Sequence, residues 1–170
     1  RDISNAVLSG TAHENSTPTI SNSTTIDDYS VSFYTPGDSI TYTFDIVNDG
    51  NYDAKIALLT KGTPVCTGSD ATSNTNVCAN IEYTLKYVSN NQDVAVNDTI
   101  AVGETKRVAL VLRYKSTITA SELPTSEVTV SGLGIVMRLS QDSLAKDNTP
   151  SGGNNNSPRY VYYIGSEYKY

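Results

Sequence analysis

The chain has 170 residues and a formal net charge of −6 at pH 7, with 12 Lys and Arg against 18 Asp and Glu. This length suits one domain, and the lack of a basic cluster argues against a row of phosphates as ligand, so we expect no nucleic-acid partner. No apolar stretch reaches the length of a membrane-spanning helix, so we expect no membrane span. The 12 Tyr, 2 Phe and many Ser, Thr and Asn residues favour an all-β fold, because these types suit half-buried strands and turns.

The first apolar segment along the chain is short and consists of Ala6, Val7 and Leu8. An isolated strand leaves its backbone donors and acceptors unpaired, so this segment is a candidate for pairing with another subunit. The polar stretch after it contains His13, the only histidine. We interpret His13 as a solvated surface residue, because it lies among polar residues and outside any catalytic motif.

Alternation of apolar and polar residues predicts the main strands. It is clearest in residues 39–48, where every second residue is apolar, as expected of a half-buried strand. The same period recurs in residues 29–33, 81–87 and 107–114. Residues 54–60 are apolar enough to be buried on both faces. The core predicted from these faces contains Tyr42, Phe44, Leu85, Leu110, Leu112, Val130 and Ile135.

Residues 127–140 contain a change of phase. Apolar residues fall on even numbers up to Val130 and on odd numbers from Leu133 onward. The change occurs at Ser131 and Gly132, and one inserted residue beside a glycine is what a β-bulge requires. We therefore predict a bulge that restores the inward face after a kink.

Turn residues separate the predicted strands. Residues 35–38, Thr-Pro-Gly-Asp, predict a type II turn, and residues 48–51, Asn-Asp-Gly-Asn, predict a turn that closes the next hairpin. Residues 119–122, Thr-Ala-Ser-Glu, have a capping-box pattern that predicts one helical turn. Many short strands with turns between them, and no long amphipathic helix, predict an antiparallel β-sandwich or jelly roll with short connections.

Two cysteines, Cys66 and Cys78, enclose a loop rich in Thr, Ser, Asn, Gly and Asp. We expect a disulfide that restrains this loop; the alternative is two free thiols. Two Cys and one His cannot complete a tetrahedral metal site. A disulfide implies an oxidising compartment, so we expect an extracellular or cell-surface protein.

Motifs of catalysis and metal binding are missing from the sequence. No metalloprotease, phosphate-loop or nucleophile-elbow pattern occurs, so we expect neither an enzyme nor a cofactor. Only separation in space identifies a glycosidase carboxylate pair, so a carbohydrate-active enzyme is kept as a third alternative. Asp49, Asn51 and Asp53 have the spacing of a calcium loop, but Ala54 replaces the glycine and no glutamate follows. We interpret them as solvated turn residues.

The C-terminal part of the chain changes composition. We predict a β-sandwich domain in residues 1–147, a linker in residues 148–158, and a strand in residues 159–170. The strand contains Tyr160, Tyr162 and Ile164. It is too short to be a domain, so it pairs with this sandwich, is donated to a neighbour, or begins a truncated second module.

Residues 34–50 carry a resemblance to a known group of proteins. A Pro-Gly-Asp turn, an alternating strand and Asn-Asp-Gly follow one another, and a second glycine turn, Gly103-Glu104, precedes a later strand. This arrangement resembles the TasA/camelysin group of secreted Gram-positive proteins, and it is similar to the surface β-sandwich modules called DUF11-like. The first resemblance implies a jelly roll that forms extracellular fibres by donating an N-terminal strand. The second implies a cell-surface stalk or adhesin module.

The sequence favours a structural subunit of an extracellular filament, pilus or surface matrix that assembles by strand exchange. The first candidate donor is Ala6, Val7 and Leu8, with Val7 or Leu8 filling a pocket of the neighbour, and the alternative donor is residues 160–164. The expected partner is therefore another copy of the chain. The rival hypothesis is a monomeric adhesin or glycan-binding module that uses the Cys66–Cys78 loop or exposed tyrosines.

Overall fold

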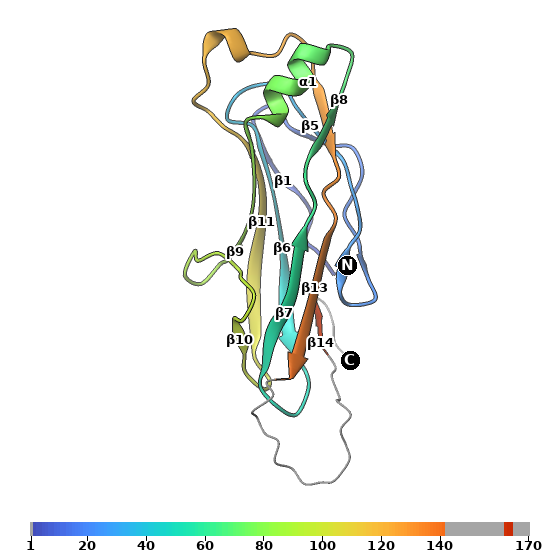
Figure 1. Ribbon diagram of the computed structural model, residues 1–170, viewed down its shortest axis with the longest axis vertical. Coiled ribbons are helices and arrows are strands. Elements are labelled where there is room, and N and C mark those ends of the chain that lie inside the picture. Colours follow the sequence, from blue (N-terminus) through green and yellow to red (C-terminus); the bar gives the residue numbers. More distant parts are fainter. Residues whose placement is uncertain (1, 142–161, 165–170) are drawn as a thin grey trace.

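The computed structural model describes residues 2–141 and the backbone of residues 162–164. The predicted linker, residues 148–158, and Tyr160 lie outside the described residues. The described part forms an elongated sandwich of antiparallel strands (Figure 1), which confirms the predicted all-β class.

One layer of the sandwich is a sheet of long strands, which we call the first sheet. In spatial order it contains β1 (Val7–Ser9), β6 (Ser39–Asn48), β11 (Thr105–Tyr114) and β9 (Ile81–Tyr87). A further strand, β14 (Tyr162–Ile164), also pairs with β6. All neighbours are antiparallel, so strand direction alternates from β1 to β9.

The facing layer is divided into two shorter sheets. One has the order β10 (Thr99–Ile100), β7 (Ala54–Lys61), β13 (Ile135–Gln141), β4 (Thr25–Ile26) and β3 (Ile20–Ser21). The other has the order β2 (His13–Glu14), β5 (Val31–Phe33), β12 (Val128–Ser131) and β8 (Val65–Thr67). Consecutive strands such as β7 and β8, or β12 and β13, follow one another along the same line in Figure 1. The two shorter sheets therefore act as one long layer that is broken near its middle.

The break between β12 and β13 is where the sequence changes phase. Gly132 has φ +74, which favours glycine, and a Cβ at Gly62 would clash with the Gly132 carbonyl oxygen. The Asp28 carboxylate accepts hydrogen bonds from the backbone N–H of Gly132 at 3.2 Å and of Leu133 at 2.6 Å. The predicted change of face is present, but it takes the form of a break between two strands and not of a bulge inside one.

The predicted core is confirmed. All seven predicted core residues are buried, with relative exposures between 0 and 4%. They belong to one apolar cluster that draws on both layers of the sandwich. Truncating a fully buried residue of this cluster removes its contacts and leaves a cavity, so each position contributes several kcal/mol, about 3–5 for Phe44.

Tyrosines fill much of the core, in keeping with the scarcity of Phe. Tyr29 and Tyr42 are fully buried and meet edge to face, with ring centroids 5.5 Å apart. The Tyr29 and Tyr83 hydroxyls lie 3.0 Å apart, and the Tyr83 hydroxyl donates to the Leu133 carbonyl oxygen at 2.5 Å. Burial raises the pKa of both tyrosines, so both hydroxyls stay protonated and can act as donors.

Two of the three predicted turns are confirmed and one is wrong. Gly37 has φ +93, and Asp38 N–H donates to the Thr35 carbonyl at 3.0 Å, as a type II turn requires. The predicted helical turn is η1 (Ala120–Glu122). Residues 48–51, however, do not close a hairpin, because β6 and β7 lie in different layers. The same turn residues serve a connection that crosses between sheets.

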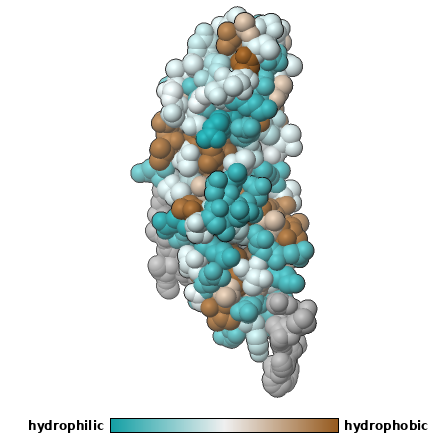
Figure 2. All heavy atoms as spheres, turned by 90° about the vertical axis from the view of Figure 1, so that its left-hand side faces the viewer, coloured by the Kyte–Doolittle hydropathy of each residue, from teal (hydrophilic) through white to brown (hydrophobic). Residues whose placement is uncertain are grey.

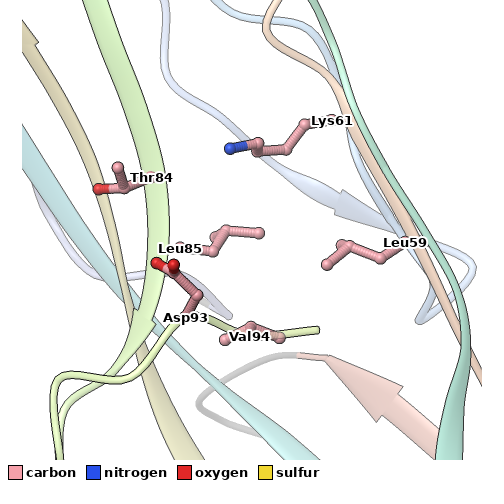
Figure 3. A pocket seen from close by; sticks show the side chains of 6 residues that line it. All are labelled: Leu59, Lys61, Thr84, Leu85, Asp93 and Val94. Carbon is pink, nitrogen blue, oxygen red and sulfur yellow. The ribbon is translucent and has the colours of Figure 1, made fainter. Parts of the chain in front are cut away.

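β7 is also less buried than predicted. Ala54 and Ile56 are buried, but Ala57 is exposed, and the register with β13 shifts there because Leu139 pairs with Ile56 and Arg138 with Leu58. Ala57 is therefore the extra residue of a β-bulge, which reverses the facing of the strand beyond it. As a result, the end of β7 turns Lys61 toward the interior side of the sandwich (Figure 3).

Candidate functional site

The N-terminal segment is an edge strand of its own chain. In β1, Val7 pairs with Thr41, Leu8 with Ile40 and Ser9 with Ser39, all antiparallel to β6. The predicted donor strand therefore already completes a sheet, in cis.

The deepest contact of this segment comes from a residue that the sequence did not single out. Ile3 is 1% exposed and belongs to the core cluster, and Ala6 packs against that cluster. Next to Ile3, Ser4 N–H donates to the Thr43 carbonyl at 2.9 Å, and Thr43 N–H donates to Ser4 Oγ at 2.8 Å. Ile3 and Ser4 thus fasten the start of the segment to the middle of β6.

Val7 and Leu8, which we expected to fill a pocket when donated, are exposed in their own sheet. Val7 is 67% exposed and Leu8 is 47% exposed. Although their backbone pairs with β6, their side chains bury little of their surface there. These two apolar residues therefore stand out from the rest of the segment, whose Ile3 is buried.

Asp38 anchors the turn that follows β1. Its carboxylate accepts from Thr11 N–H at 2.8 Å and Thr11 Oγ1 at 2.6 Å, and from the backbone N–H of Tyr34 at 3.0 Å and of Thr35 at 2.9 Å. Burial alone would raise the pKa of Asp38, but these hydrogen bonds outweigh it and hold the pKa below its usual range. Gly10, with φ +73, lies so close that a Cβ there would clash with the carboxylate.

The second predicted donor lies on the same edge of β6. In β14, Tyr162 pairs with Asn48 and Ile164 with Ile46, again antiparallel to β6. β1 covers residues 39–41 of that edge, and β14 covers residues 46–48. The first and last strands of the described chain therefore share one edge, end to end.

The disulfide is confirmed. Cys66 and Cys78 are bonded, with Cα atoms 5.8 Å apart. The loop between them is not irregular, because it contains α1 (Ala71–Cys78), whose N-cap Asp70 accepts from Ser73 N–H at 2.9 Å. The bond ties the C-terminal end of this helix to β8, at the end of the molecule shown uppermost in Figure 1.

A small pocket of about 210 Å³ opens between β9 and β7. Its lining consists of Leu59, Lys61, Thr84, Leu85, Asp93 and Val94. Figure 3 shows Leu59 and Leu85 pointing toward each other from the two layers, with the Lys61 amine above them. The Lys61 ammonium donates to the Tyr83 backbone carbonyl at 2.5 Å. The pocket therefore has an apolar floor beside a strand edge that is covered by a lysine.

The remaining candidate residues lie apart from this pocket. The His13 side chain is 65% exposed, with its Nε2 3.8 Å from Glu127 Oε2. The carboxylates of Glu14 and Asp45 are engaged, one by the Tyr42 hydroxyl at 2.6 Å and the other by the Arg107 guanidinium at 2.8 Å. Within residues 2–141, no three His, Cys, Asp or Glu side chains form a cluster that could hold a metal ion.

Comparisons with known proteins give no family. No model of a protein family, no curated protein and no solved structure matches this chain. Among the described residues, no helix has the length and apolar character needed to cross a membrane.

Proposed function

We propose that this chain is a structural subunit of an extracellular filament or surface matrix, in which the N-terminal segment of one subunit pairs with β6 of the next. The supporting observation is that residues 3–9 lie along the edge of β6, with β1 paired to it and Ile3 anchored in the core. Such a segment can occupy the same site on a second copy with every contact kept.

The connection to the body of the domain suits this exchange. Only residues 10–12 separate β1 from β2, and Gly10 has φ +73. Short hinge loops favour domain swapping, and a glycine adopts extended backbone angles as readily as the angle of this turn, so the hinge can open. A head-to-tail exchange is a heterologous contact, so it propagates into a filament unless it closes into a ring.

β14 is the alternative donor. Twenty residues, 142–161, separate it from the end of β13. The entropic cost of closing a loop grows only slowly with length, so a connection of this length permits pairing in cis, and it is also long enough to reach a neighbouring subunit. Because β1 and β14 pair with the same edge of β6, β6 is the acceptor strand for either of them.

Paired cysteines test which chain supplies β1. In the variant V7C/T41C, the two residues lie directly opposite each other across β1 and β6. If the strand is exchanged, oxidation after assembly links subunits into a ladder on a non-reducing gel, and negative-stain microscopy shows filaments. The matched control is T43C/A109C, a directly opposed pair on β6 and β11, which links only within one chain. Monomeric products from both variants, with no filaments at any concentration, would refute the proposal.

A second candidate function is a monomeric adhesin. Around α1 and η1, Val65 is 52% exposed and Leu123 is 48% exposed, at the end of the molecule braced by the disulfide. A rigid end with exposed apolar residues suits binding to a glycan or a host protein. Retention of the monomer on immobilised glycans, lost in the variant V65S/L123S, would favour this function over polymerisation.

A further inference from the structure

The first sheet has two edges that differ in their protection. β1 consists of Val7, Leu8 and Ser9, with no charge and no proline, and within the described residues no strand pairs with its outer side. An uncharged, apolar edge is a template for pairing with another chain. The opposite edge, β9, is covered only in part, since Asp93 pairs with Lys86 and Val94 N–H donates to the Leu85 carbonyl.

The outward-facing backbone groups of the two edges are complementary. Thr43 donates its N–H to Ser4 Oγ and accepts from Ser4 N–H at its carbonyl, so the backbone groups of the odd-numbered residues of β6 point toward β1. By alternation, the backbone N–H and C=O of Val7 and Ser9 point toward β6, and those of Leu8 point away from the sheet edge. On β9, the carbonyl of Leu85 points away from β11. By the same alternation, the backbone N–H and C=O of Tyr83 also point away from β11, whereas its side chain is buried. Leu8 and Tyr83 are thus the donor and acceptor positions of the two edges.

The register across the sheet places these two residues in one row. Leu8 lies opposite Ile40, Ile40 opposite Leu112, and Leu112 opposite Tyr83. The neighbouring row runs from Val7 to Thr84 in the same way. Strand direction alternates over four strands, so a second copy displaced along the sheet brings its β1 antiparallel to β9 and in this register.

We propose that the β1 edge of one copy pairs with the β9 edge of a second copy, with Leu8 entering the pocket between β9 and β7. Leu8 shares the inward face with Ile40, so beside β9 its side chain projects toward Leu85 and Leu59. Val7 comes to lie beside Thr84 on the outer face. Leu8, 47% exposed in the single chain, gains burial from the contact, and so does the apolar floor of the pocket.

Lys61 covers the acceptor site in the single chain. Its ammonium donates to the Tyr83 carbonyl and lies 5.5 Å from the centre of the Tyr83 ring. In the proposed contact, Leu8 N–H of the second copy donates to this carbonyl instead. A lysine at a sheet edge opposes pairing, because docking must displace or bury its charge. Lys61 therefore sets how tightly the edges bind.

This contact does not depend on strand exchange. β1 presents the same outer edge whether it lies on its own β6 or on that of a neighbour. Figure 2, which shows the side of the molecule that bears β9, has separate apolar patches divided by polar ones and no broad apolar surface. A strand-edge contact of limited area is what such a surface allows, and it gains strength when repeated along or between filaments.

Mixed single-cysteine variants test the contact, because trapping detects weak association. The native cysteines are bonded to each other, so V7C and T84C each have one free thiol. An equimolar mixture under mild oxidation should give the V7C–T84C heterodimer several-fold above the T43C–T84C control, whose Thr43 lies on an inner strand. Strand exchange alone brings Val7 next to Thr41 and gives no such product. A dominant V7C homodimer, or a heterodimer no more abundant than the control, would overturn the inference.

Substitutions in the pocket provide a second measurement. K61M should strengthen self-association several-fold in sedimentation velocity, and L59E should weaken it several-fold, with both circular dichroism spectra unchanged. K55M, on the same strand, is the matched control and should behave as the unaltered chain. Equal association constants for K61M and the unaltered chain would overturn the role of Lys61, and unaltered association of L59E would overturn docking in the pocket.

Discussion

Asp38 holds Thr11 through two hydrogen bonds, 2.8 Å to its backbone nitrogen and 2.6 Å to its hydroxyl. Thr11 lies in the turn after β1, whereas Asp38 ends the turn before β6. This pair therefore links the hinge of the N-terminal strand to the strand on which it lies. Opening the hinge must break both bonds, so Asp38 opposes the release of β1.

Replacing Asp38 by Asn should destabilise the domain by about 1–3 kcal/mol, because buried N–H and O–H donors lose a charged acceptor. It should also speed hydrogen exchange in residues 4–9. Urea unfolding measures the first effect and mass spectrometry the second. D27N is the control. Asp27 accepts hydrogen bonds from the hydroxyls of Thr19 and Ser21, away from β1, so this variant should leave exchange in residues 4–9 unaltered.

The same carboxylate predicts a dependence on pH. The hydrogen bonds lower the pKa of Asp38 in the folded state, so the unfolded state binds its proton more readily. The stabilisation is present above the unfolded pKa of about 4 and is lost as the pH falls through the lower folded pKa. The melting temperature of D38N should therefore fall less between pH 5 and about pH 3 than that of the unaltered chain. Parallel curves would show that Asp38 does not carry this effect.

Phe44 reports on the core of the sandwich. It is fully buried on β6, so Phe44→Ala should lower the free energy of unfolding by about 3–5 kcal/mol through lost contacts and a cavity. Thr41→Ala, on the outer face of the same strand, should change it by less than about 0.5 kcal/mol. A loss below about 1 kcal/mol for Phe44→Ala, measured in urea, would mean that the inward face of β6 is misassigned.

Tyr83 connects the two layers through its hydroxyl, which contacts the Tyr29 hydroxyl and the Leu133 carbonyl. Tyr83→Phe leaves that carbonyl without its donor at the break between β12 and β13, and should cost about 1–3 kcal/mol. Tyr34→Phe, whose side chain is 44% exposed, should be close to neutral in the same urea titration. Equal unfolding free energies for the two variants would show that the Tyr83 hydroxyl does not stabilise the break between β12 and β13.

The strands could be predicted because burial leaves a period of two in the sequence. Phe44, Leu110 and Val130 alternate with polar neighbours, and that pattern alone places them in the core. The type II turn and the helical turn η1 were likewise predictable, since each depends on the chemistry of four consecutive residues. These features are local, so they need no knowledge of which strands become neighbours.

Features that depend on tertiary context were missed. α1 is built from Ala, Thr, Ser, Asn, Val and Cys, mostly weak helix formers, and it is held by the Asp70 cap, the burial of Val77 and the disulfide. Ile3 is a single apolar residue among polar ones, so no period indicates its burial. Residues 48–51 could serve a hairpin or a crossing between layers, and only the packing decides between them. The pocket between β9 and β7 likewise depends on the bulge at Ala57.

The last prediction concerns the anchoring of the N-terminal strand. Ile3 is 1% exposed and Val7 is 67% exposed, although both belong to the same segment. Ile3→Ser should therefore loosen the segment and destabilise the domain by about 2–4 kcal/mol, because it removes a buried apolar side chain and places a hydroxyl in the core. Val7→Ser should leave the unfolding free energy almost unchanged. Amide exchange of residues 4–9 should rise only in Ile3→Ser. If the segment completes the sheet of a neighbour, Ile3→Ser filaments should also dissociate at lower urea than those of the unaltered chain. A larger loss of unfolding free energy in Val7→Ser than in Ile3→Ser would show that Val7, and not Ile3, anchors the segment.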